Sequence, residues 1–229
     1  MMKISPGKYT LCFILLVLLI PCTLLGQQKD FQSWWELEVD KGLKSGFNLS
    51  GELEQRFRNN SLQYDRTLVT LAGEYDVKDY LSVAAGLRAL LVSDRELQLY
   101  PRYRMHVEAT GRTSISAFNL SYRLRLQYGF DDLLYLGDVL MNNLGVRNRL
   151  KVTHHIFGTR LGWFATIESW HHLYNPSNRL FYKMRYSAGA QYTLNFRSEL
   201  SLRYILEEEF NVTNPLQSHI LVLGYSHIL

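Results

Sequence analysis

From Phe47 onward, apolar and polar side chains alternate along the sequence. In residues 47–58, one face of the expected strand carries Phe, Leu and Gly, and the other carries Asn, Ser, Glu and Arg. Because successive side chains of a β-strand point to opposite faces, this pattern predicts strands with one apolar and one charged face. It delimits eleven candidate strands, at about 33–41, 46–58, 64–76, 80–92, 96–108, 114–129, 146–157, 159–172, 180–195, 198–210 and 216–228.

Turn signals separate these strands. Short polar turns are expected at 76–79, 110–113 and 157–159, and longer connections at 59–63, 175–178 and 211–215. Strands separated by such turns are typical of hairpins, which join antiparallel strands. Residues 27–229 show neither a helical period nor a low-complexity linker, so they are predicted to form one all-β domain.

The lengths of the strands and their charged faces point to a membrane. The alternating stretches run to about 12–16 residues, whereas strands of soluble sheets average about 5–6 and a tilted strand crosses a bilayer in about 9–11. Arg and Glu are costly to bury unpaired, so the charged face requires a lumen with water or paired charges. We therefore expect a single antiparallel, up-and-down transmembrane β-barrel with its apolar face towards lipid.

The number of strands does not follow directly from this alternation. Bacterial single-chain barrels have even numbers of strands, and eleven candidates break that rule. A twelfth strand within residues 131–144 would restore it, and we favour twelve. Ten strands would result if two candidates near the N-terminus were one. The segment 131–144 could equally be a surface loop or a short helix folded inward.

The first 26 residues have the layout of a secretory signal peptide. A charged start precedes an apolar run from Leu11 to Ile20, and polar residues follow Gly26. We expect cleavage after Gly26; the alternatives are an uncleaved anchor helix at 11–25, which Pro21 would interrupt, and a lipoprotein anchored through Cys22. Cleavage would remove Cys12 and Cys22, the two cysteines of the chain.

Cleavage also changes the charge balance. The chain has 25 Lys and Arg against 21 Asp and Glu, and residues 1–26 contain Lys3 and Lys8 but no acid. The mature chain would therefore carry 23 basic and 21 acidic residues, or +2. Without a clustered basic face or a reading motif, this balance predicts no nucleic-acid partner.

Arginines and glutamates share the charged face of neighbouring strands, where they could pair across strands. Two interpretations stay open: a charged pore lining or anionic-ligand site, and a self-neutralising network that closes a narrow barrel. The near-balanced signs favour the network. Its expected members are Glu52, Glu54, Arg56, Arg58, Glu74, Arg88, Arg102, Arg104, Glu108, Arg123, Arg125, Arg147, Arg149, Glu168, Arg185, Arg203 and Glu207.

Aromatic residues gather near the ends of the expected strands. Tyr and Trp favour the interface between membrane and water, where the ring is in an apolar layer and the polar tip stays wet. The residues expected in this belt are Trp34, Trp35, Tyr128, Tyr174, Tyr182, Tyr192 and Tyr225.

Several segments resemble a known family. They are the opening Asp30-Phe31-Gln32-Ser33-Trp34, the strand 52–58, a Gly86-Leu87-Arg88 strand, and the Arg-x-Arg pairs 102/104, 123/125 and 147/149. Over essentially the whole mature chain, these resemble the Gram-negative outer-membrane barrels grouped as domain of unknown function 2490. The resemblance implies the fold and the outer-membrane location, and it implies no activity. The chain departs from many outer-membrane barrels in ending on Leu229 rather than on an aromatic residue.

Candidate catalytic groups are few. Ser169 and His171 share a face, as in outer-membrane enzymes that hydrolyse lipids, but residues two apart on a strand are roughly 7 Å apart. The pairs His154-His155 and His171-His172 point to opposite faces and cannot chelate one metal. Acids such as Asp131 and Asp132 match no calcium loop.

We therefore predict no metal site, cofactor or catalytic residue. The expected function is a non-catalytic outer-membrane barrel, either structural or a narrow pore. Its expected partners are outer-membrane lipids, the barrel-assembly machinery during insertion, and a possible further membrane protein. The alternatives are an outer-membrane hydrolase that uses His171 or the loop acids, and a secreted soluble barrel that binds a small ligand.

Overall fold

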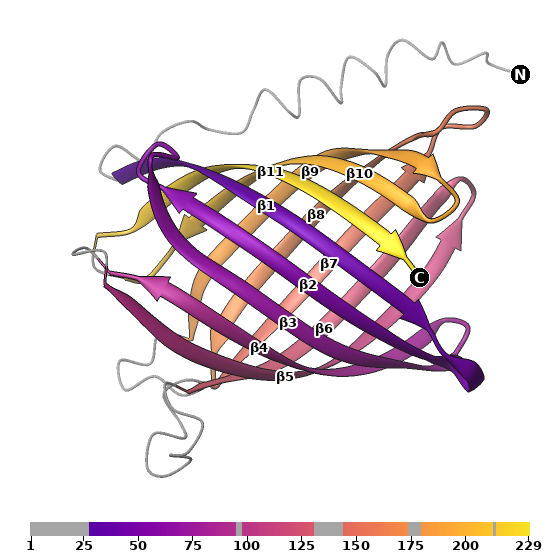
Figure 1. Ribbon diagram of the computed structural model, residues 1–229, viewed down its shortest axis with the longest axis horizontal. Coiled ribbons are helices and arrows are strands. Elements are labelled where there is room, and N and C mark those ends of the chain that lie inside the picture. Colours follow the sequence, from indigo (N-terminus) through magenta and orange to yellow (C-terminus); the bar gives the residue numbers. More distant parts are fainter. Residues whose placement is uncertain (1–27, 95–97, 131–143, 174–179, 213) are drawn as a thin grey trace, which may run out of the picture.

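The computed structural model describes residues 28–94, 98–130, 144–173, 180–212 and 214–229 (Figure 1). The expected signal peptide lies outside these ranges. The elements are β1 (Gln28–Gly42), the short 3-10 helix η1 (Lys44–Gly46), β2 (Phe47–Arg58), β3 (Gln63–Lys78), β4 (Leu81–Ser93), β5 (Leu99–Ile115), β6 (Phe118–Phe130), β7 (Leu144–His155), β8 (Leu161–His172), β9 (Phe181–Asn195), β10 (Ser198–Glu209) and β11 (Leu216–Ile228). No helix in the described ranges is long and apolar enough to cross a membrane.

The strands form one closed barrel, which confirms the predicted fold class. Each strand pairs with its neighbour in the sequence in antiparallel register, and β1 pairs with β11 to close the sheet. This closing pair is parallel, with Gln28 opposite Leu216 and Asp40 opposite Ile228.

The preference for twelve strands is wrong for the described barrel, which has eleven. β6 bonds directly to β7, with Tyr128 opposite Leu144, so no strand stands between them, and 131–143 lies outside the described residues. An odd number is possible because the last strand of an up-and-down odd-numbered sheet runs in the same direction as the first. The parallel β1–β11 pair thus removes the need for the even count that guided the prediction.

The expected turn at 110–113 is also wrong, because these residues continue β5. Arg112 pairs with Ser121 and Ser114 with Asn119, and the chain reverses at residues 116–117. Ser116 has φ of 56°, the left-handed conformation that tight hairpins use. Polar character alone placed the turn too early, because the polar residues near the strand end extend beyond the apolar stretch.

The connections sort to the two ends of the barrel. The β1–β2, β3–β4, β5–β6, β7–β8 and β9–β10 connections and the C-terminus lie at one end, called here the short-turn end. The strand ends on either side of the remaining connections lie at the other end of the barrel, called here the long-connection end, on the left in Figure 1. Because β1 runs parallel to β11, β1 also starts at the long-connection end.

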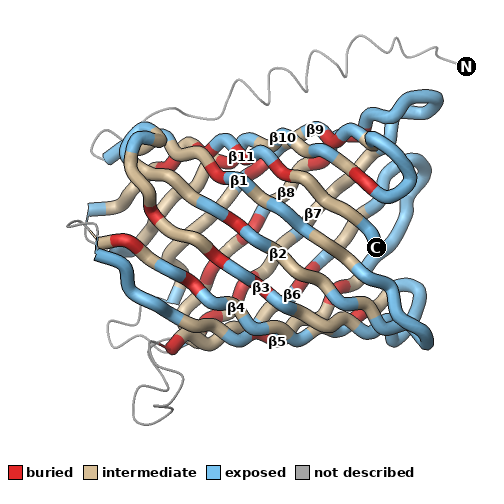
Figure 2. The backbone as a smooth tube through the Cα atoms, in the orientation of Figure 1, coloured by how far each residue is buried: buried red, intermediate tan, exposed pale blue. Residues whose placement is uncertain are grey.

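Burial alternates along the strands, as the tube in Figure 2 shows. In β3, Leu68 is 2% exposed, Val69 46%, Thr70 6% and Leu71 67%. One face of the wall is therefore covered by the barrel itself, and the other is open to the surroundings. A small apolar cluster of Trp34, Ile205, Ile220 and Val222 is the main hydrophobic core of the inner face.

Candidate functional site: the charged interior of the barrel

The charged side of each strand is the covered side. Glu54, Arg123, Arg147 and Glu168 are buried, whereas Leu53, the neighbour of Glu54, is exposed. Charged residues are almost never buried unless they are paired. Their burial therefore places them in the lumen, where other strands supply partners, and it leaves the apolar side chains outside.

Glu168 on β8 is the centre of one group of ion pairs. Its Oε1 accepts hydrogen bonds from Arg123 at 3.0 Å and from Arg147 at 2.9 Å, and its Oε2 lies 3.9 Å from Arg185. Arg123 also lies 3.6 Å from Glu108, which accepts a further hydrogen bond from Arg125. Charge-assisted bonds of this kind compensate the desolvation of buried charges.

Further ion pairs line the rest of the inner face. Arg88 reaches over β3 to Glu52 at 2.8 Å, and Arg203 reaches over β11 to Glu36 at 2.6 Å. Glu207 pairs with Lys183 at 2.8 Å and with Arg185, and Glu54 pairs with Arg56. The Arg88–Glu52 and Arg203–Glu36 pairs each skip a strand, so they tie together parts of the wall that are not hydrogen-bonded to each other.

Five inward residues form an alternating stack that we call the Arg–Trp ladder: Arg56, Trp34, Arg185, Trp170 and Arg147. The guanidinium carbon lies 3.6 Å from the Trp34 ring centroid for Arg56 and 5.0 Å for Arg185. Arg185 and Arg147 each lie 4.6 Å from the Trp170 ring centroid. Each cation–π contact contributes about 0.5–2 kcal/mol.

The ladder passes through the lumen. It begins on β2, continues through β1, β9 and β8, and ends on β7. β1 and β9 are not neighbours in the sheet, because β10 and β11 stand between them. The contact between Arg185 and Trp34 therefore joins separated parts of the wall, and the ladder fills the interior with side chains that also hold ion pairs.

Other predicted members of the network lie nearer the ends of their strands. Arg58 lies 3.6 Å from Asp65 and donates to the carbonyl of Asp94 at 2.7 Å, and Glu74 accepts from Arg112 at 3.0 Å. Arg102 shares the inward side of β5 with the buried His106. Arg104 and Arg149 make no ion pair with another described residue.

Several inward residues were absent from the predicted network. Trp170, Glu36, Lys183, Asp65 and Arg66 all take part in the contacts of the inner face. The alternation itself could have found three of them. Trp170 is in phase with Glu168, Glu36 with Trp34 and Lys183 with Arg185. Asp65 was harder to place, because a register shift beside Arg56 interrupts the alternation there.

The predicted belt of interfacial aromatics divides between the two faces. Trp35 and Tyr192 are exposed on the outer face, Tyr128 and Tyr225 share its phase, and Tyr174 lies outside the described residues. Trp34 is buried in the lumen, so its predicted interfacial position is wrong. Tyr182 stacks on His172, on the inward side of β8, with ring centroids 4.0 Å apart. A register shift in the β8–β9 pair beside this contact accounts for its inward position.

Ser169 and His171 are closer than their spacing suggested. His171 Nε2 lies 3.1 Å from Ser169 Oγ, because the two side chains lean together although their backbones are two residues apart. On the same outer face, Asn148 is directly opposite Ser169, and its Oδ1 accepts a 2.8 Å hydrogen bond from the Tyr122 hydroxyl. These four residues form a polar group on a largely apolar surface.

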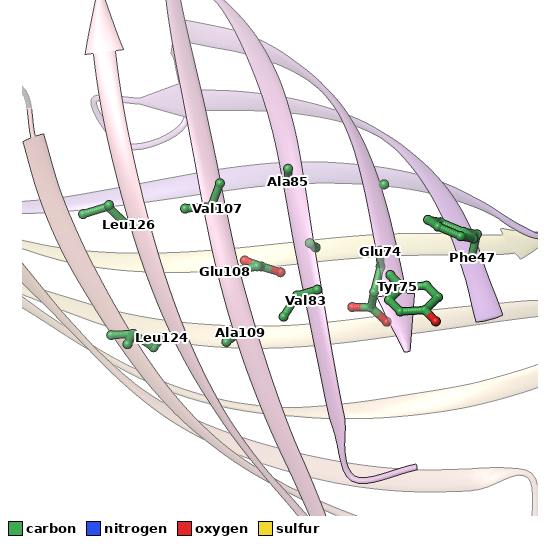
Figure 3. Close-up of a pocket in the computed structure, with 12 residues that line it drawn as sticks. Phe47, Glu74, Tyr75, Val83, Ala85, Val107, Glu108, Ala109, Leu124 and Leu126 are labelled. Atoms are coloured by element: carbon green, nitrogen blue, oxygen red, sulfur yellow. The ribbon is translucent and has the colours of Figure 1, made fainter. Parts of the chain in front are cut away.

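A groove of about 640 Å³ lies on the outer face between β2 and β6 (Figure 3). Small residues, including Gly73, Ala85 and Ala109, form its floor, and larger apolar side chains such as Phe47 and Leu126 border it. The groove offers no polar cluster. Within the described ranges, no group of three or more His, Cys, Asp or Glu side chains could hold a metal ion.

A closed sheet with an apolar outside and an ion-paired inside defines a β-barrel of the membrane-spanning kind. The model of the family described as "Protein of unknown function (DUF2490)" matches residues 31–217, and the chain belongs to this family. This membership bears out the resemblance found in the sequence.

Several solved structures match the chain at low similarity. A NanC porin is 18% identical, with 77% of this chain and 86% of that chain covered and a TM-score of 0.47. The β domain of the Bordetella autotransporter BrkA is 10% identical, with 80% and 84% covered and a TM-score of 0.46. OccAB2 of Acinetobacter baumannii is 12% identical, with 77% and 54% covered and a TM-score of 0.34. No curated protein matches the sequence.

Proposed function

We propose that this protein is an integral outer-membrane β-barrel with a closed lumen, a structural element rather than a general diffusion pore. The observation that carries this proposal is the Arg–Trp ladder, in which Arg185 stands between Trp34 and Trp170. The same arginine pairs with Glu207 and lies 3.9 Å from Glu168. A solute crossing the lumen would have to break these contacts together.

The outer face supports the membrane location. The strands are 12 to 17 residues long, enough to cross a bilayer at a tilt with residues to spare at both ends. Leu and Val side chains on the outward phase are exposed along the whole wall, a surface that favours lipid over water. Outer-membrane lipids and the assembly machinery that inserts barrels are the partners this placement requires.

Conductance in planar bilayers tests the closed lumen. The wild-type protein should give no stable conductance steps in 1 M KCl, whereas Trp170→Ala and Trp34→Ala should open a path by removing the rings that hold Arg185. Trp35→Ala is the matched control, because it removes an adjacent ring from the outer face. Circular dichroism verifies that each variant keeps its strands. Large, stable conductance in the wild type would contradict the proposal.

The Ser169–His171 contact favours a second candidate function, an acyl-ester hydrolase at the lipid-facing surface. The 3.1 Å distance suits a nucleophile and its general base, and contact through Nε2 leaves Nδ1 for an orienting group. His171 lies one residue before the end of β8, where an outward side chain of a membrane-spanning strand would approach the lipid headgroups. In the described part of the chain, no carboxylate bonds to His171, which is why this function ranks second.

The chemistry would be acyl transfer to Ser169. Its Oγ would attack the ester carbonyl carbon while His171 Nε2 takes the hydroxyl proton and passes it to the departing alcohol. Water would then release the acid from Ser169. A second pair, Ser198 and His227, meets at 3.0 Å through Nδ1, and its serine is buried, so it lacks both the geometry and the access.

Hydrolysis of a phospholipid in mixed detergent micelles tests this candidate. Ser169→Ala and His171→Ala should each lower the rate at least about a hundredfold. Ser198→Ala, the matched control, should leave the rate unchanged. Equal rates for the wild type and Ser169→Ala would remove the hydrolase from consideration.

A further inference from the structure

We propose that the inner face around Arg104 binds a small oxyanion, a phosphate or a carboxylate, that enters from the long-connection end. Arg104 is on the inward side of β5, near its start. Arg104 makes no hydrogen bond, ion pair or ring contact with another described residue, although most inward arginines have a carboxylate partner. A guanidinium presents five N–H donors in a planar fork that matches a carboxylate or phosphate.

The surroundings of Arg104 are positive. Arg88 is directly opposite it on β4, and the charges of Arg88, Arg56 and Arg66 act on it. The three neighbours have the partners Glu52, Glu54 and Asp65. Four guanidiniums against three carboxylates leave one positive charge without compensation in this group.

Such an arrangement is unfavourable for a purely structural network. Like charges directly opposite on paired strands destabilise a sheet, and an unpaired charge in a partly buried place costs free energy. In another part of the lumen, one carboxylate serves two guanidiniums, because Glu168 accepts hydrogen bonds from both Arg123 and Arg147. An oxyanion at Arg104 would supply the charge that Glu168 supplies there.

The position of Arg104 also suits entry of a ligand. Arg102, two residues earlier on the same side of β5, lies closer to the long-connection end. The ladder residue Arg56, whose charge also acts on Arg104, is two residues from the end of β2 at this same end of the barrel. The site is thus a basic part of the inner wall near one end of the lumen, which suits a small anion.

Calorimetric titration of the full-length protein in detergent tests the site. Inorganic phosphate and acetate are titrated separately at constant ionic strength, which shows which oxyanion binds better. Arg104→Gln should weaken binding at least tenfold, about 1.4 kcal/mol, and Arg104→Lys should weaken it less because the charge remains. Arg112→Gln is the control: Arg112 is on the same side of β5 but pairs with Glu74 and Asp76.

Three results would overturn the site. The first is no phosphate or acetate binding by the wild type, and the second is equal binding by the wild type and Arg104→Gln. A comparable loss in Arg112→Gln would do so as well, because the effect would then reflect total charge. If Arg104→Gln does not fold, a comparison of anion binding by Arg104→Lys and Arg112→Lys answers the same question. Conductance does not enter this test, so the site and the closed lumen can fail separately.

Discussion

Trp34 and Trp35 are adjacent in β1 and lie on opposite faces of the barrel wall. Trp34 is 3% exposed and contacts Arg56 and Arg185, whereas Trp35 is 52% exposed on the apolar outer surface. The first ring is held by specific contacts with charged partners. The free energy of the second ring depends on the medium around the barrel. Two tryptophans thus have different environments, because successive side chains of a strand point to opposite faces.

The same contrast holds for the whole wall. On the inner face, each buried charge depends on a particular partner, as Arg147 depends on Glu168. On the outer face, neighbouring apolar side chains are interchangeable, and the groove between β2 and β6 exists because small residues gather there. Substitutions should therefore be costly on the inner face when they remove a partner, and on the outer face only when they introduce charge.

The largest effect is expected for Glu168→Ala. The substitution leaves Arg123 and Arg147 buried without their shared carboxylate, which should lower the free energy of unfolding by about 3–5 kcal/mol. Urea unfolding in detergent measures the change. Ile167→Ala, next in sequence but on the outer face, should cost clearly less. Equal costs for the two would remove the distinction between the faces.

A charge on the outer face should have the next largest effect. Leu87 is exposed near the middle of β4, and Leu87→Arg should cost about 2–4 kcal/mol in a bilayer because the guanidinium would face hydrocarbon. Leu62→Arg, in the exposed connection between β2 and β3, should cost close to nothing. Unfolding in lipid vesicles measures both. A tolerated arginine at 87 would show that this surface does not face lipid.

The smallest effect is expected at the end of the barrel, where the side chains are exposed to water. Arg112 pairs with Glu74 and Asp76 near the short-turn end, where its side chain is largely exposed. Arg112→Gln should change the free energy of unfolding by about 0–1 kcal/mol, because exposed ion pairs are screened. The same urea titration detects it. A loss as large as that for Glu168→Ala would mean that this end of the lumen is as dry as its centre.

Some predictions were wrong because a general rule was preferred to the pattern of the residues themselves. The alternation marked eleven strands, and the preference for an even number then moved the prediction to twelve. Trp34 was assigned to the interface because tryptophans favour it, although its phase matched that of Glu36. The distance between Ser169 and His171 was judged from backbone spacing, which ignores the reach of an imidazole. In each case, the local pattern was sound and a general expectation replaced it.

By itself, the sequence determined which side chains share a face and where most strands run. That information is local, because the direction of successive side chains along an extended chain follows from the backbone alone. Closure through a parallel β1–β11 pair, the Arg–Trp ladder and the missing partner of Arg104 were decided only by the tertiary structure. They depend on which strands lie across the lumen from one another, and side chains far apart in the sequence meet there only after the sheet has closed.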